Sequence, residues 1–84
     1  MVSVEWRPMA LEALAQLDPV VKDRIVAKVA WLADNFESIT PEPLHRELRG
    51  LYKLRVGDHR VAYALTGRNT ITIVIVGHRR DVYH

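Results

Sequence analysis

Cysteine is absent from the 84 residues of this chain. Its absence excludes a disulfide scaffold, a thiol nucleophile and a zinc site built on thiolates. Long apolar runs are absent as well, since no stretch approaches the roughly 18 residues that indicate a membrane-spanning helix. The first residues, Met1–Trp6, lack the basic and apolar segments of a signal peptide. We therefore expect one small soluble domain, residues 1–84, that acts in the cytoplasm.

The residue patterns of several catalytic classes are missing too. Ser3 and Ser38 are the only serines, and neither lies in a G-x-S-x-G motif. The four histidines show no H-x-x-x-H spacing, which argues against a metal site, and no glycine-rich phosphate loop occurs. We therefore expect chemistry that uses neither a metal nor another cofactor.

The formal net charge is only +2, but the charges are unevenly distributed. Residues 1–47 carry eight acidic and five basic side chains, whereas residues 48–84 carry seven basic and two acidic ones. Six of those seven bases are arginines, which suit forked contacts with phosphate. The asymmetry fits an anionic partner for the second half of the chain, and it equally fits a solvated basic surface.

The first half of the chain shows a strand pattern followed by two helix patterns. Apolar and polar residues alternate over Val2–Arg7, which predicts a short strand. Helix formers fill Met9–Leu17, and from Val21 to Phe36 an apolar residue recurs every three or four positions. Asp18 followed by proline is a typical start for the second helix. We expect a helical hairpin joined at Leu17-Asp18-Pro19.

After Gly50 the apolar period changes from 3.6 to 2. This change predicts three strands, which are Leu51–Val56, His59–Thr66 and Thr70–Val76. The expected fold class is α+β, with a short N-terminal strand, a two-helix hairpin and a three- to four-stranded antiparallel sheet that carries the helices on one face.

The turn at Gly57-Asp58 predicts which residues lie opposite each other. Glycine at the first central position suits a type II′ hairpin, which pairs Arg55 with Arg60 and Lys53 with Ala62. These four side chains then share one face of the sheet, and the alternate residues of both strands, up to Leu65, face the helices.

The next hairpin closes through the three residues Gly67-Arg68-Asn69. This loop places Ile71, Ile73 and Ile75 on the helix-facing side and brings Val76 level with Arg60. Four aromatic residues are expected to pack in the core: Trp6, Trp31, Tyr52 and Tyr63.

Two arginines directly opposite each other repel. Either Arg55 and Arg60 splay into solvent, or an anion lies between them. Lys53 and the segment Gly77–Arg80 bring further cations to the same end of the sheet, where they suit a phosphodiester and the charge that develops on it. RNA supplies its own nucleophile, the 2′-OH, so the protein needs only cations and a proton-transfer group such as Lys53.

Two segments carry a resemblance to a known family: LRGLYKLRVGDHRVAY at residues 48–63 and VGHRRDVY at residues 76–83. With both motifs at this spacing, the chain resembles the RelE/ParE superfamily of bacterial toxins, and within it the RelE branch. The resemblance implies a RelE-like toxin domain over residues 1–84 and a ribosome-dependent mRNA endonuclease that cuts in the ribosomal A site by 2′-OH attack without metal. It also implies a cognate antitoxin and a toxin–antitoxin complex that binds its own operator DNA.

The resemblance implies a set of catalytic residues by position. Lys53 matches the first basic residue of the family's K-x-K pair, and Arg55 stands where the second lysine is found. Arg60 matches the arginine near the start of the next strand, Arg79 the arginine of the G-x-R segment, and Tyr83 the C-terminal tyrosine. In the family these residues serve as base or acid, as phosphate stabilisers, and as a residue that orients the nucleophile. Four further residues are predicted to contact RNA: Arg49, His78, Arg80 and His84.

The chain departs from the family pattern in ways that bear on these roles. Arginine at position 55 removes one possible proton shuttle and leaves Lys53 with that task. Some relatives end in His-Tyr, whereas this chain ends in Tyr83-His84.

Two other functions stay open. One is a ParE-like inhibitor of DNA gyrase that shares the fold without the nuclease residues. The other is a nucleic-acid-binding co-repressor that acts only with its antitoxin.

Overall fold

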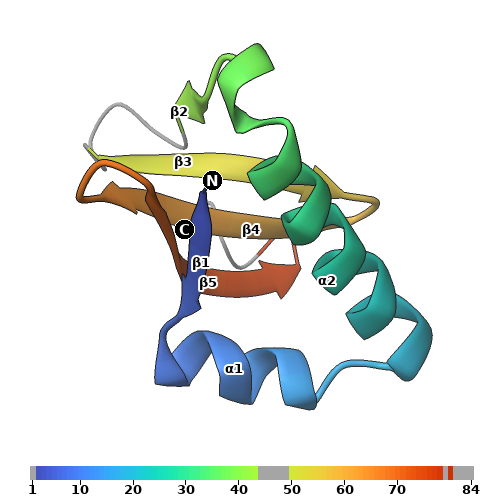
Figure 1. The fold of residues 1–84 in the computed structure, drawn as a ribbon. Coiled ribbons are helices and arrows are strands. Elements are labelled where there is room, and N and C mark those ends of the chain that lie inside the picture. The colour runs from blue at the N-terminus through green and yellow to red at the C-terminus, as the bar shows by residue number, and fades with distance from the viewer. Residues whose placement is uncertain (1, 44–49, 79, 81–84) are drawn as a thin grey trace.

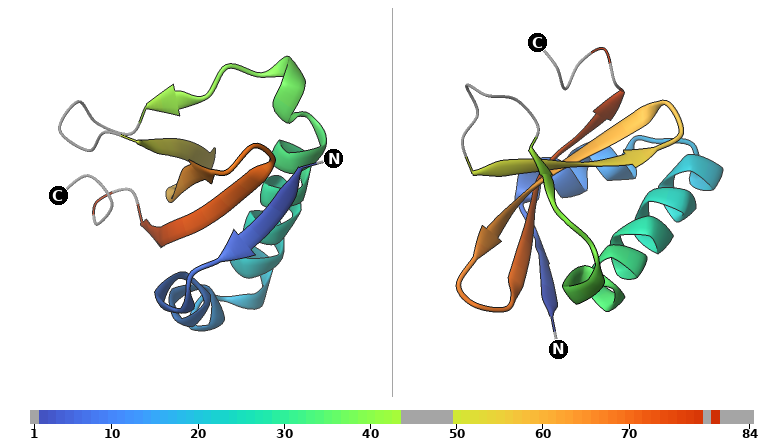
Figure 2. Two further views of the ribbon diagram at one scale, coloured as in Figure 1. Left: turned by 60° about the vertical axis from the view of Figure 1, so that its left-hand side comes forward. Right: turned by 90° about the horizontal axis from the view of Figure 1, so that it is seen from above.

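The computed structural model describes residues 2–43, 50–78 and 80. Helices pack against one face of a single sheet, which Figures 1 and 2 show from three directions. The elements, in chain order, are β1 (Ser3–Trp6), α1 (Pro8–Ala15), α2 (Pro19–Asp34), the short 3-10 helix η1 (Phe36–Ser38), β2 (Glu42–Pro43), β3 (Leu51–Val56), β4 (His59–Thr66) and β5 (Thr70–His78). The α+β fold is the one predicted.

The sheet has five strands, the N-terminal strand and four antiparallel ones, and of these only β2 had not been assigned from the sequence. Its five strands lie in the order β1-β5-β4-β3-β2, so the two short strands form the edges. β1 pairs with β5 in parallel, although the two are far apart in sequence, and β2 pairs antiparallel with β3. The helices follow each other directly, but α1 lies along one end of the sheet and α2 rises along its side at an angle to α1 (Figure 1).

Local signals place the ends and faces of α2. The carboxylate of Asp18 accepts a hydrogen bond from the backbone N–H of Val20 at 3.2 Å, which satisfies one of the unpaired donors at the helix start. Ile25, Val29 and Leu32 of the predicted apolar stripe are buried against the sheet. The spacing of three and four residues puts them on one side of the helix, as expected.

β3 and β4 pair in the predicted register. Arg55 lies opposite Arg60, and Lys53 lies opposite Ala62. Gly57 has a φ of +59°, a conformation that glycine adopts readily and that a type II′ turn requires at this position. A two-residue turn therefore determines the pairing of the whole hairpin.

The register between β4 and β5 differs from the prediction. The strands leave the expected three-residue loop with Thr66 opposite Thr70, but a bulge shifts the pairing between Ala62 and Tyr63. Tyr63 lies opposite Ile73 and Ala62 opposite Ile75, so one additional residue, at position 74, is inserted in β5.

The bulge reverses which side chains of β5 face the helices. Ile71 and Ile73 are fully buried in the core, as predicted. Beyond the bulge, Val76 joins the core opposite Val61, whereas Ile75 packs with Ala62 in a separate cluster. The predictions that Ile75 faces the helices and that Val76 lies level with Arg60 were therefore wrong, because one inserted residue exchanges the two faces.

One further core prediction was wrong, because Trp31 keeps 43% of its surface exposed. Leu65, near the end of β4, keeps 40% of its surface exposed. Trp6 packs against the core as expected, and the rings of Tyr52 and Tyr63 lie 5.7 Å apart between centroids. Among the described residues, no helix has the length and apolar content needed to cross a membrane.

Candidate nucleic-acid interface

A row of cations crosses the end of the sheet on the face that carries no helix. Arg55, Arg60 and Gly77 lie side by side on β3, β4 and β5. Gly77 contributes no side chain beside Arg60. The same pairing places His78, which follows Gly77, opposite His59.

The two arginines of this pair have different surroundings. Arg55 is exposed, whereas Arg60 keeps only 4% of its surface exposed. The Nη1 atom of Arg60 donates to the carbonyl oxygens of Gly57 and His59, both at 3.0 Å. These hydrogen bonds anchor the guanidinium at the β3–β4 turn, so its charge has a defined position. The two positive charges can lie opposite each other because the Arg60 side chain is held by the backbone and the Arg55 side chain extends into solvent.

Lys53 lies in the next row and has an acidic neighbour. Its Nζ lies 3.8 Å from a carboxylate oxygen of Glu42, which is opposite it on β2. A strand of two residues is too short to show alternation, so no local signal placed Glu42 beside Lys53.

Small and apolar residues border the cations. Ala62 is fully buried and packs with Leu51 and Ile75 on the helix-free face. This cluster is a mostly buried apolar group on the helix-free face, two residues along β4 from Arg60.

The two histidines at the end of β4 and β5 lie opposite each other. The rings of His59 and His78 are 5.6 Å apart between centroids and meet edge to face. The Nδ1 atom of His78 accepts a hydrogen bond from the backbone N–H of Arg80 at 3.3 Å. Arg80 is exposed.

Several of the predicted site residues lie outside the described residues. Arg79 and Tyr83, predicted to be catalytic, belong to this group, as do Arg49 and His84, predicted to contact RNA. The described part of the predicted site consists of Lys53, Arg55, Arg60, His78 and Arg80.

One tyrosine near the site is strongly perturbed. Burial raises the pKa of Tyr63 from its ordinary value of 10.0 to about 12, with smaller contributions from Tyr52 and Glu42. Tyr63 therefore stays protonated at any physiological pH. It packs in the core and is not a candidate for proton transfer.

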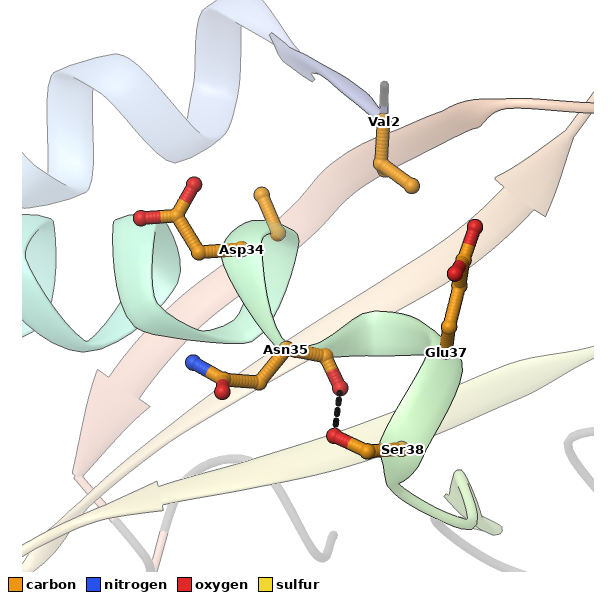
Figure 3. A pocket seen from close by; sticks show the side chains of 6 residues that line it. Val2, Asp34, Asn35, Glu37 and Ser38 are labelled. Carbon is orange, nitrogen blue, oxygen red and sulfur yellow. Dashed lines mark hydrogen bonds between the residues drawn. The ribbon is translucent and has the colours of Figure 1, made fainter.

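One cavity lies away from the cations. It has a volume of about 470 Å³ and lies beside the C-terminal end of α2, near the start of β1 (Figure 3). Asp34 and Glu37 line it, and Ser38 donates a hydrogen bond to the carbonyl oxygen of Asn35 at 3.0 Å. Its carboxylates would repel a phosphate, and none of the predicted site residues lines it.

Comparison with known proteins identifies a family that nearly the whole chain resembles. Residues 4–83 match the family described as the ParE toxin of the type II toxin–antitoxin system parDE. Toxin RelG from Mycobacterium tuberculosis is 33% identical over 86 residues, an alignment that covers 96% of this chain and 94% of that protein.

Solved structures agree with the fold. The toxin–antitoxin complex RelBE2 from M. tuberculosis contains a chain with a TM-score of 0.75 and 28% identity, covering 93% of this chain and 98% of that one. The isolated RelE toxin of E. coli has a TM-score of 0.75 at 15% identity, covering 93% of this chain and 84% of that one.

Proposed function

This chain belongs to the ParE toxin family of type II toxin–antitoxin systems, within the RelE/ParE superfamily, and we propose that it is an endoribonuclease that cleaves messenger RNA on the ribosome. The observation that carries the proposal is the pairing of Arg55 with Arg60 directly across β3 and β4, beside Lys53 on the helix-free face. Arginine side chains on neighbouring strands can contact the oxygens of one phosphodiester, which supports this proposal.

The proposed reaction is attack of the RNA 2′-OH on the adjacent phosphorus. The 2′ oxygen loses its proton and forms a bond to phosphorus, and the bond from phosphorus to the 5′ oxygen breaks as that oxygen gains a proton. Arg60, anchored by the turn, and Arg55 stabilise the charge that builds on the phosphate oxygens. Lys53 takes part in proton transfer, because the arginines keep their protons at working pH.

The remaining predicted residues complete the proposal. Arg79 stabilises the phosphate, and Tyr83 orients or activates the nucleophile. Arg49, His78, Arg80 and His84 contact the RNA. No metal takes part in the proposed chemistry.

We further propose that a cognate antitoxin neutralises the toxin in the cytoplasm and that the complex binds its own operator DNA. Several solved relatives are toxin–antitoxin complexes, which supports a protein partner of this kind. The amount of free toxin then depends on mass action, since free toxin appears only when the concentration of the antitoxin falls below that of the toxin.

The test compares two arginine variants of equal charge change. The chain is added to programmed ribosomes, and new 5′ ends in the mRNA are mapped by primer extension. Arg55→Ala is expected to slow cleavage by at least about tenfold, less than the 10²- to 10³-fold loss typical of a buried oxyanion donor. Arg24→Ala, which removes an exposed arginine from α2, keeps the wild-type rate. Intact mRNA with the wild-type protein contradicts the proposal.

One observation favours a second candidate function. The matching family is that of ParE toxins, and a ParE-like chain would inhibit DNA gyrase. Inhibition of gyrase supercoiling by the purified chain, together with intact mRNA, would establish this alternative. Binding of operator DNA only in the presence of the antitoxin, with neither activity, would establish the co-repressor.

A further inference from the structure

A second hollow lies at the side of the sheet, next to the row of cations. It has a volume of about 270 Å³, and Leu32, Leu54 and Tyr63 form apolar parts of its wall. β2 pairs with Tyr52 and Lys53, and among the described residues no strand lies beside β3 beyond Lys53. The hollow lies along this open edge, between β3 and α2.

An exposed tryptophan on α2 lines this hollow. Trp31 keeps 43% of its surface exposed, whereas the apolar stripe of the same helix is buried. The Nζ atom of Lys28 lies 4.1 Å from the centroid of the indole ring, which is a cation–π contact. This contact restrains the indole before any ligand arrives, so little side-chain freedom is lost when a ligand stacks on it.

The same hollow reaches the predicted cleavage site. Lys53 and Arg55 line it together with Trp31 and Lys28. One space therefore joins a large aromatic surface, an apolar wall and three cations, with Glu42 as the only carboxylate among the described residues that line it. A phosphate held by Arg55 would bring its neighbouring base to the mouth of this hollow.

We propose that this hollow is a binding subsite for one nucleobase of single-stranded RNA, with Trp31 as its stacking surface. Its volume lies just below the range of about 300–1,000 Å³ typical of pockets for drug-sized ligands, which suits a single flat ring system. Stacking on an aromatic side chain accepts every base, because each has a π face, and size and edge contacts then set a preference. The choice of RNA as ligand rests on the proposed function.

An antitoxin side chain is the competing occupant. A hydrophobic anchor of a protein partner would use the apolar wall, but it would leave the cations of Lys28 and Arg55 uncompensated. A nucleotide satisfies both parts, because its base stacks and its phosphate pairs with the cations. The composition of the hollow therefore favours RNA.

The test measures the binding of short oligomers to the full-length protein. One probe is a fluorescently labelled hexaribonucleotide with 2′-O-methyl groups, which cannot be cleaved by 2′-OH attack, and the other is an abasic sugar–phosphate oligomer of the same length. Trp31→Ala is expected to weaken binding of the first probe by roughly 5- to 150-fold, the range for loss of one base–aromatic stack. Binding of the abasic probe stays unchanged, and Trp31→Phe retains most of the affinity.

Met9→Ala is the matched control, since it removes another exposed apolar side chain, from α1. Circular dichroism verifies that each variant is folded. Equal binding of the first probe by Trp31→Ala and Met9→Ala overturns the inference. So does an equal loss for both probes, which would indicate a change in charge contacts rather than stacking. Unchanged RNA binding with weakened antitoxin binding would assign the hollow to the antitoxin and overturn the inference as well.

The outcome is separable from that of the proposed function. If the wild-type protein leaves mRNA intact on ribosomes but its RNA binding depends on Trp31, the cleavage proposal fails and the subsite stands. If cleavage occurs and Trp31→Ala alters neither RNA binding nor the positions of the cuts, the subsite fails alone.

Discussion

Arg55 and Arg60 lie directly opposite each other with the same charge, yet their replacement by alanine should have different consequences. Arg60 is buried and donates hydrogen bonds to two turn carbonyls, whereas Arg55 is exposed. We predict that Arg60→Ala destabilises the fold and that Arg55→Ala leaves it intact or slightly stabilises it. Both variants should lower mRNA cleavage.

The magnitude follows from the contacts of each side chain. A hydrogen bond that involves a charged group contributes about 1.5–3 kcal/mol, so loss of both Arg60 contacts costs on the order of 3 kcal/mol at the lower end. A domain of this size has a total stability of roughly 4–13 kcal/mol, so the loss is a large part of it. Arg55→Ala removes a like-charge cross-strand pair, which relieves roughly 0.2–1 kcal/mol of repulsion.

The assay combines urea denaturation, followed by circular dichroism, with cleavage on programmed ribosomes. Arg60→Ala should shift the urea midpoint to lower concentration with little change in slope, because the extent of surface exposed on unfolding is the same. Arg60→Lys keeps the charge but loses the planar fork, and should lie between wild type and Arg60→Ala. A wild-type midpoint for Arg60→Ala, or an equal loss for Arg55→Ala, would refute the assignment of an anchoring role to Arg60.

Three further predictions follow from single features of the fold. Glu42→Gln removes the carboxylate that lies 3.8 Å from the Nζ of Lys53. Since both side chains are partly exposed, the change should alter stability by less than about 1 kcal/mol and should tighten RNA binding, measured by anisotropy. Gly57→Ala should cost about 1 kcal/mol in thermal unfolding, because φ at this position is +59°; an unchanged melting temperature would contradict the turn assignment. The pKa of Tyr63 is about 12 in the folded state and about 10 in the unfolded state. The contribution of Tyr63 to the free energy of unfolding should therefore be complete below pH 10 and fall by up to roughly 2.7 kcal/mol between pH 10 and 12. Denaturation at several alkaline pH values would detect this loss, and Tyr63→Phe should abolish it.

Much of the fold was predictable from short stretches of sequence. Periodicity identified the buried stripe of α2, Asp18 marked its start, and the glycine at position 57 determined the pairing of Arg55 with Arg60. These features follow from residues within a few positions of each other, where helix geometry and turn conformation restrict the backbone directly. For the same reason the basic row on the helix-free face could be assigned before the structure.

The tertiary structure decided what depends on residues far apart in sequence. β2 brings Glu42 to Lys53, and the helices and the bulged β5 strand determine which apolar residues are buried. The inserted residue lets Ile73 and Val76 both enter the core, although strict alternation would place them on opposite faces. The burial of Arg60 and the exposure of Trp31 depend on the same packing. The sequence of short segments determined the strands, the helices and one hairpin. The environment of each candidate site residue depends on how segments far apart in the sequence pack together to bury their apolar surface.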